Sequence, residues 1–367
     1  MKIRGLAAFS FYKSFLCRWL GAFFLILGLG SVFGLVYSVD PLFEHDQLTK
    51  FLPGLAKANI GFLSDDWISN LKLLYPLFTG LVFWFTKLFG TSSFYVVILF
   101  FMGLYFFFLL EIPRIGLTDL VSSSQEILKR DKIIRNGFKQ WPWGWYKLIQ
   151  NKGCVTCLAL NSMILLILHS YYVRQDVSWG SPLHSFTWVR GMANQYIINS
   201  HFIPSSFGIL FLAAIFFFLR RNYIGTSFCI AGAVSFHPAM MFVGVVFSLA
   251  FIVRQFTEGA SLKSVALFAG GTLLLSLPAG AYSIWLVTSG PSELLNQSME
   301  IYRQIRSPGT QLISEWMNTQ GTVRLGLFFV AIILVRRTSL GFIMIMVFGV
   351  SFIFTLFHLV FDDMFFS

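Results

Sequence analysis

The stretch Asp40–Trp67, DPLFEHDQLTKFLPGLAKANIGFLSDDW, decides how the rest of the chain must be arranged. It carries five of the protein's 16 acidic residues and directly follows the first long apolar segment. Within it, apolar residues recur at i, i+3, i+4 and i+7, which is typical of a helix with one apolar face. These residues are Leu48, Phe51, Leu52 and Leu55. The stretch therefore predicts a short helix lying on a membrane surface, with acidic residues at both ends.

The composition indicates a polytopic membrane protein. Hydrophobic residues make up 56% of the 367 residues and charged residues 12%, whereas a soluble domain carries about 25% charged residues. The formal net charge is +11, which in so apolar a chain indicates basic cytoplasmic loops and contact with anionic lipid headgroups. Because no soluble basic domain is visible, the charge does not indicate nucleic-acid binding.

Ten apolar segments approach or reach the length of about 20 residues that a membrane-spanning helix needs. They are 18–38, 75–90, 93–112, 154–173, 204–219, 222–236, 239–253, 264–288, 321–335 and 339–361. We therefore expect an all-α protein of about ten transmembrane helices, organised as one integral membrane domain over residues 1–367. The basic start of the chain predicts a first span that is retained in the membrane, not removed as a signal peptide.

The positions of Lys and Arg predict how the chain is oriented. They favour a cytoplasmic N-terminus and a cytoplasmic 113–153, which is both basic and aromatic and is expected to lie on the membrane surface. Loops 39–74, 174–203 and 289–320 are then extracytoplasmic. Two complete spans just before 113–153 would place it on the wrong side. Either 75–90 does not fully cross the membrane, or the basic stretch breaks the rule.

Two later stretches carry further candidate residues. The loop 176–204 holds Arg190 and Asn194; an Arg fork suits phosphate, and amides suit sugar hydroxyls. The pair His237-Pro238 lies inside an apolar run, where an ionisable residue is costly and a functional role is the first hypothesis. An ordinary polar loop and a hydrogen-bonded core histidine are the structural alternatives.

Three motifs occur in a characteristic order, namely Asp46-Gln47, Asp66-Trp67 and His237-Pro238. Over residues 18–255 this order resembles the GT-C superfamily of polytopic glycosyltransferases, and within it the bacterial members. The resemblance implies transfer of a sugar from a polyprenyl-phosphate carrier to a glycan, lipid or protein acceptor. It also implies a place in the bacterial cytoplasmic (inner) membrane, with the acceptor bound on the extracytoplasmic face.

The resemblance implies that an acid of the first loop is the base, with Asp46 the leading candidate and Asp40 the next. We expect Asp65 or Asp66 to be a second acid. An inverting transfer needs one carboxylate to take the acceptor proton and cations or donors near the leaving phosphate. Asp65 or Asp66 would bind the acceptor or a divalent metal such as Mg²⁺ or Mn²⁺; no cofactor is otherwise expected. The expected substrate-binding residues are Gln47, Asp65, Trp67, Arg190, Asn194 and His237.

Two alternatives remain open at the level of sequence. Broken helices and a histidine at membrane depth would also suit a transporter or lipid flippase. A non-catalytic membrane subunit would need none of these residues for chemistry.

Overall fold

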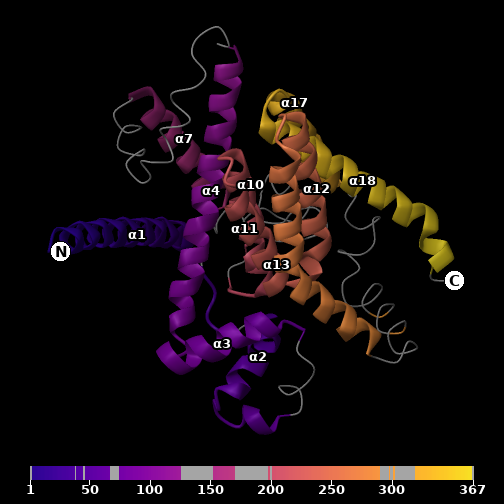
Figure 1. Cartoon of the computed structure of the whole chain (residues 1–367). Coiled ribbons are helices and arrows are strands. Elements are labelled where there is room, and N and C mark those ends of the chain that lie inside the picture. The colour runs from indigo at the N-terminus through magenta and orange to yellow at the C-terminus, as the bar shows by residue number, and fades with distance from the viewer. Residues whose placement is uncertain are drawn as a thin grey trace.

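The computed structural model (Figure 1) describes residues 2–37, 39–43, 46–66, 74–124, 152–169, 197–198, 201–289, 297, 301 and 319–365. All regular elements in this part of the chain are helices. They are α1 (Lys2–Tyr37), α2 (Asp46–Lys57), η1 (Leu63–Asp65), α3 (Pro76–Phe89), α4 (Ser93–Ser124), α7 (Lys152–Leu168), η4 (Pro204–Gly208), α10 (Ile209–Leu219), α11 (Tyr223–Phe236), η5 (Pro238–Met240), α12 (Met241–Thr257), α13 (Leu262–Thr288), α17 (Thr319–Val335) and α18 (Ser339–Phe365).

Each of the ten predicted apolar segments coincides, over most of its length, with one of these helices. Four helical stretches are long and apolar enough to cross a membrane: Leu20–Tyr37, Ser93–Gly116, Pro238–Thr257 and Leu262–Leu286. The other apolar helical stretches found there, among them Ser339–Phe354 of α18, are 10–17 residues long. The described part of the chain is thus all-helical, with four candidate spans that fit an integral membrane protein, and the count of about ten stays a prediction.

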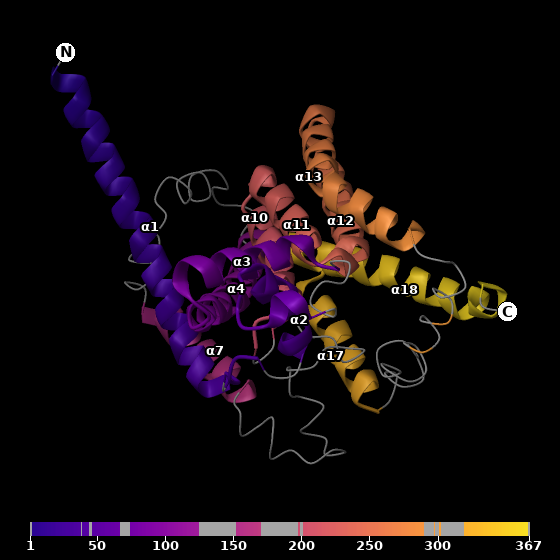
Figure 2. The same ribbon diagram turned by 90° about the horizontal axis from the view of Figure 1, so that it is seen from below.

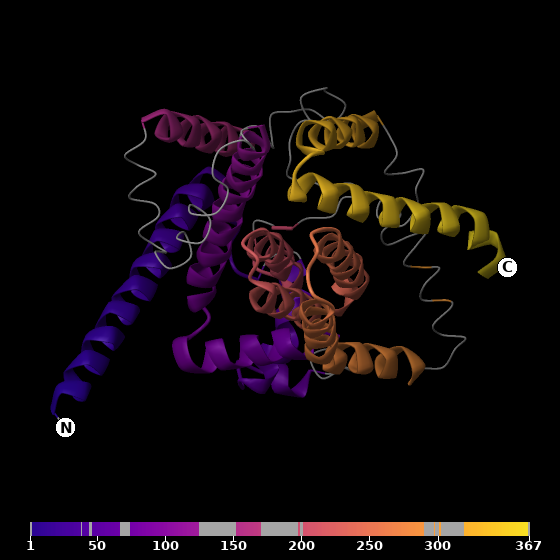
Figure 3. The ribbon, with the colours of Figure 1, turned by 45° about the horizontal axis from the view of Figure 1, so that its top comes forward.

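A group of helices that alternate in direction forms the centre of the molecule (Figures 1 and 3). Helices α4 and α10 run in the same direction, as two ring contacts show. At one end the Phe101 ring meets the Phe207 ring edge-on, with 4.9 Å between centroids, and further along Phe108 lies 5.5 Å from Phe216. Helix α11 is antiparallel to α10, α12 is antiparallel to α11, and α13 is antiparallel to α12. The bundle therefore has two ends, each made of chain turns.

His237-Pro238 lies at one of these turns, between α11 and α12. The N–H of His237 donates to the Ala233 carbonyl at 3.0 Å, as the last bond of α11, and Pro238 has no N–H with which to continue the helix. The chain then reverses direction, and α12 packs closely against α11. A Cβ on Gly244 would lie 2.8 Å from the Val234 side chain. His237 is therefore at the end of the bundle, between two antiparallel helices.

Helix α3 lies across this same end of the bundle (Figure 2). The Tyr75 ring, just before α3, lies 5.1 Å from His237, and Phe85 in the second half of α3 lies 6.0 Å from Phe94 at the start of α4. Its 14 residues span about 21 Å, short of the roughly 30 Å hydrocarbon core. The structure thus favours the alternative in which 75–90 does not cross, so that α4 alone carries the chain to the opposite end.

The opposite end of the bundle is basic. The Glu111 carboxylate, whose side chain is only 2% exposed, pairs with Arg114 at 2.6 Å and with Arg220 at 3.6 Å. At the turn after α12, Arg254 Nε lies 2.8 Å from Glu258 Oε1. The first of these clusters joins α4 to α10, and both mark the end that is rich in arginine.

Helix α1 crosses α4 at a steep angle (Figure 1). The two backbones touch where glycines face each other, since a Cβ on Gly30 would overlap the Leu99 carbonyl and one on Gly103 would overlap the Ile26 carbonyl. Small residues permit such close approach in membrane proteins, where helix association depends on packing.

The predicted helix in the first loop is confirmed as α2, which begins at Asp46 and continues through Pro53. Phe51 is fully buried and Leu55 is 5% exposed, whereas Leu48 is 51% exposed. The Phe51 ring packs on Phe94 at 4.7 Å between centroids. The apolar face of α2 is therefore docked on the end of the bundle.

Candidate functional site

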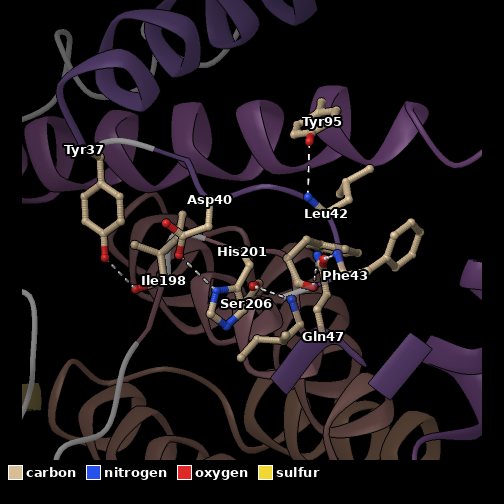
Figure 4. A network of polar contacts seen from close by, with 11 residues as sticks. Tyr37, Asp40, Leu42, Phe43, Gln47, Tyr95, Ile198, His201 and Ser206 are labelled. Atoms are coloured by element: carbon tan, nitrogen blue, oxygen red, sulfur yellow. Dashed lines mark hydrogen bonds and ion pairs between the residues drawn. The ribbon is translucent and has the colours of Figure 1, made fainter. Parts of the chain in front are cut away.

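The site is built where the linker after α1, the first turn of α2 and the segment 201–208 meet (Figure 4). The linker is held on two sides. The Tyr37 hydroxyl donates to the Ile198 carbonyl at 3.4 Å, and the Leu42 N–H donates to the Tyr95 hydroxyl at 3.1 Å. Between these two anchors the chain presents Asp40.

Gln47 joins the three segments. Its side chain is fully buried. Its Oε1 accepts the Phe43 N–H at 2.7 Å, and its Nε2 donates to the Phe202 carbonyl at 3.0 Å. With both ends of its amide used in this way, Gln47 positions the linker against 201–203. Its expected role in binding substrate stays a prediction.

Asp40 and His201 face each other across this junction, 161 positions apart in sequence. Asp40 Oδ2 lies 3.4 Å from His201 Nδ1, and the side chains are 34% and 6% exposed respectively. With Nδ1 protonated, the buried imidazole donates to the carboxylate and fixes its direction. A partly exposed carboxylate held in this way can accept a proton from a bound hydroxyl.

A second polar group lies at the same end of the bundle. Lys50 Nζ, from α2, lies 4.8 Å from the centre of the Tyr75 ring, which in turn lies 5.1 Å from the His237 ring. Burial, with a smaller contribution from the Lys50 charge, lowers the pKa of His237 to about 4. The imidazole is therefore neutral at pH 7, and Lys50 supplies the positive charge of this group.

The predicted acidic residues are not all brought together. Asp40 and Gln47 meet at the junction, whereas Asp65 and Asp66 follow the opposite end of α2, which is 12 residues or about 18 Å long. Asp46 begins α2, but its side chain is outside the described part, as are Trp67, Arg190 and Asn194. The structure thus gives Asp40 a described partner in His201.

Metal binding was an open expectation for the acidic residues. Among the residues that the structure describes, no three His, Cys, Asp or Glu side chains gather closely enough to hold a metal ion. The polar groups at this end of the bundle are instead pairs and mixed clusters of acid, base and aromatic residues.

Sequence reasoning did not single out Lys50 and Tyr75. Lys50 lies two positions after Leu48, which belongs to the predicted apolar face. Tyr75 directly precedes Pro76, the first residue of α3. A lone cation beside the apolar face of a short helix was the available signal, but nothing local to it points to His237.

The described residues form an all-helical fold that fits an integral membrane protein, with a polar site at one end of its helix bundle. No family model, curated protein or solved structure matches the chain. The function must therefore be argued from the site itself.

Proposed function

We propose that this protein is a membrane glycosyltransferase that moves a sugar from a polyprenyl-phosphate carrier to an extracytoplasmic acceptor. The observation that carries the proposal is the Asp40 carboxylate, partly exposed and held by the buried His201 at 3.4 Å. It stands at the end of the bundle opposite the arginine-rich end. By the positive-inside rule, that position supports our proposal of a site on the extracytoplasmic face of a bacterial inner membrane, with the N-terminus in the cytoplasm.

The reaction needs one base and one leaving group. The acceptor oxygen attacks the anomeric carbon of the sugar while the bond from that carbon to the phosphate oxygen breaks. The electron pair leaves with the polyprenyl phosphate, and the acceptor proton passes to Asp40. His201 acts as a positioning residue, because its hydrogen bond aims the carboxylate and leaves the chemistry to Asp40.

The proposed base is Asp40, whereas the resemblance makes Asp46 the leading candidate. Asp40 has a described and largely buried partner in His201, and its linker is anchored through Tyr37 and Leu42. A base must be held in one direction to be effective, so the geometry supports Asp40. Asp46, whose side chain lies outside the described part, stays the candidate that the resemblance puts first.

The transporter alternative rests on broken helices and on a histidine at membrane depth. His237 lies at the turn between α11 and α12, which supports this alternative less than a position inside a helix would. No described contact of the chain favours transport.

The test uses the purified protein in lipid nanodiscs with a panel of polyprenyl-phosphate sugars and measures the free polyprenyl phosphate released. We expect Asp40→Asn to lower the rate by about 10²–10⁴-fold, with Lys57→Gln, an exposed change on α2, as the matched control. Asp46→Asn measured in parallel decides between the two acids. Two results would overturn the proposal. One is that wild type releases no polyprenyl phosphate from any donor, and the other is that Asp40→Asn and Asp46→Asn both release it at a rate near that of wild type.

A further inference from the structure

Lys50, Tyr75 and His237 come from three elements that the fold brings together. Lys50 belongs to α2, Tyr75 precedes α3, and His237 ends α11. All three side chains are partly exposed, so the cluster is accessible from outside the bundle. The Tyr75 ring is near both basic groups, since its centre lies 4.8 Å from the Lys50 nitrogen and 5.1 Å from the centre of the His237 ring.

The cluster carries a positive charge without a matching acid. Among the described residues no carboxylate lies within 4.0 Å of Lys50 Nζ, and its contact with the Tyr75 ring is a cation–π interaction. Among the described residues, His237 Nδ1 is enclosed and has no hydrogen-bond partner, so Nε2 is the nitrogen that can meet a ligand. An ammonium group and an imidazole N–H for which the described part of the chain offers no acceptor are suited to one anion.

We propose that Lys50 and His237 bind the phosphate group of a lipid at the membrane surface, with Tyr75 holding the Lys50 ammonium in place. Phosphate presents several acceptor oxygens, and both Lys and a neutral His can donate to it. The cluster stands at the end of the bundle to which the interfacial helix α2 is docked, at the level where lipid headgroups lie.

Two lipids could supply this phosphate. One is the polyprenyl-phosphate carrier, in which case the inference rests on the proposed function and the site holds the leaving group of the transfer. The other is an ordinary anionic phospholipid, in which case the site anchors α2 to the bilayer surface. The chemistry at Lys50 and His237 is the same for both lipids.

Titration calorimetry on the full-length protein in detergent micelles tests the inference, with three probes measured in turn. The probes are polyprenyl phosphate, phosphatidylglycerol and inorganic phosphate. We expect wild type to bind at least one of the two lipids and Lys50→Gln to raise its Kd by about tenfold or more. Lys50→Arg, which keeps the charge, should bind within a few-fold of wild type, and Lys57→Gln on the same helix should leave the Kd unchanged.

Each result has a defined meaning. Preference for polyprenyl phosphate assigns the carrier, and equal binding of phosphatidylglycerol assigns a bilayer lipid. Binding that Lys50→Gln and His237→Gln both leave unchanged, or no binding of either lipid by wild type, overturns the site. Lys50-dependent binding by a protein that transfers no sugar would refute the proposed function alone, and sugar transfer together with Lys50-independent binding would refute this site alone.

Discussion

Gln47 is the residue whose loss should most directly disturb the candidate site. It is fully buried, and its amide joins the Phe43 N–H and the Phe202 carbonyl at 2.7 Å and 3.0 Å. Leucine at position 47 fills a similar volume but offers neither a donor nor an acceptor. The change therefore leaves two backbone groups without their partner, one on each side of the junction that holds Asp40 against His201.

The expected cost follows from these two groups. An unpaired buried polar group costs about 1–3 kcal/mol, and the bond to Phe43 is only partly buried, so water recovers part of its loss. We expect Gln47→Leu to lower the free energy of unfolding by about 2–4 kcal/mol. Sugar transfer should fall as well, because the linker that presents Asp40 is no longer fixed to segment 201–203.

Chemical unfolding in detergent micelles, followed by tryptophan fluorescence, measures the stability change. Lys57→Gln on the exposed side of α2 is the matched control and should stay within about 0.5 kcal/mol of wild type. A Gln47→Leu protein as stable as this control would refute the reasoning, because the two hydrogen bonds would then not hold the junction together.

Three further changes test the helix crossing, the bundle turn and the basic end. Gly103→Leu should destabilise the protein by at least about 2 kcal/mol, because its Cβ overlaps the Ile26 carbonyl and separates α1 from α4; thermal unfolding in micelles measures this. Since the pKa of His237 is lowered from 6.5 to about 4, its neutral form contributes stability that is complete above pH 6.5 and is lost as the pH falls toward 4. That contribution is at most about 3 kcal/mol, and His237→Gln should flatten the stability profile over this range. Glu111→Gln removes the partner of the Arg220 guanidinium and should cost about 3 kcal/mol in the free energy of unfolding.

Each of these changes has a control and a contradicting result. Gly80→Leu introduces a side chain where nothing lies within 4 Å, so it should be tolerated, and equal effects of both glycine changes would contradict the close crossing of α1 and α4. An identical pH profile for wild type and His237→Gln would show that the histidine is not buried in its neutral form. Arg221→Gln, at a side chain 73% exposed, should cost less than Glu111→Gln, and the reverse order would contradict the role of the buried carboxylate.

The sequence by itself determined the helical class and the place of the helices. Length and apolarity located the segments that became α1, α4, α12 and α13, because the hydrocarbon thickness sets a length that can be read locally. The spacing of Phe51 and Leu55 likewise predicted the buried face of α2, since the period of a helix is a local property of the chain.

Tertiary structure decided which of these helices cross the bundle and which polar groups meet. Helix α3 is apolar except for Thr79, Thr86 and Lys87. Only its contacts at both ends with the same end of the bundle, through Tyr75 and Phe85, show that α3 lies across that end. Asp40 and His201 are 161 positions apart, and no local pattern specifies that pairing. It arises because α2 docks its apolar face on α4 and Gln47 then binds the Phe202 carbonyl, and packing of this kind depends on the shapes of several helices together.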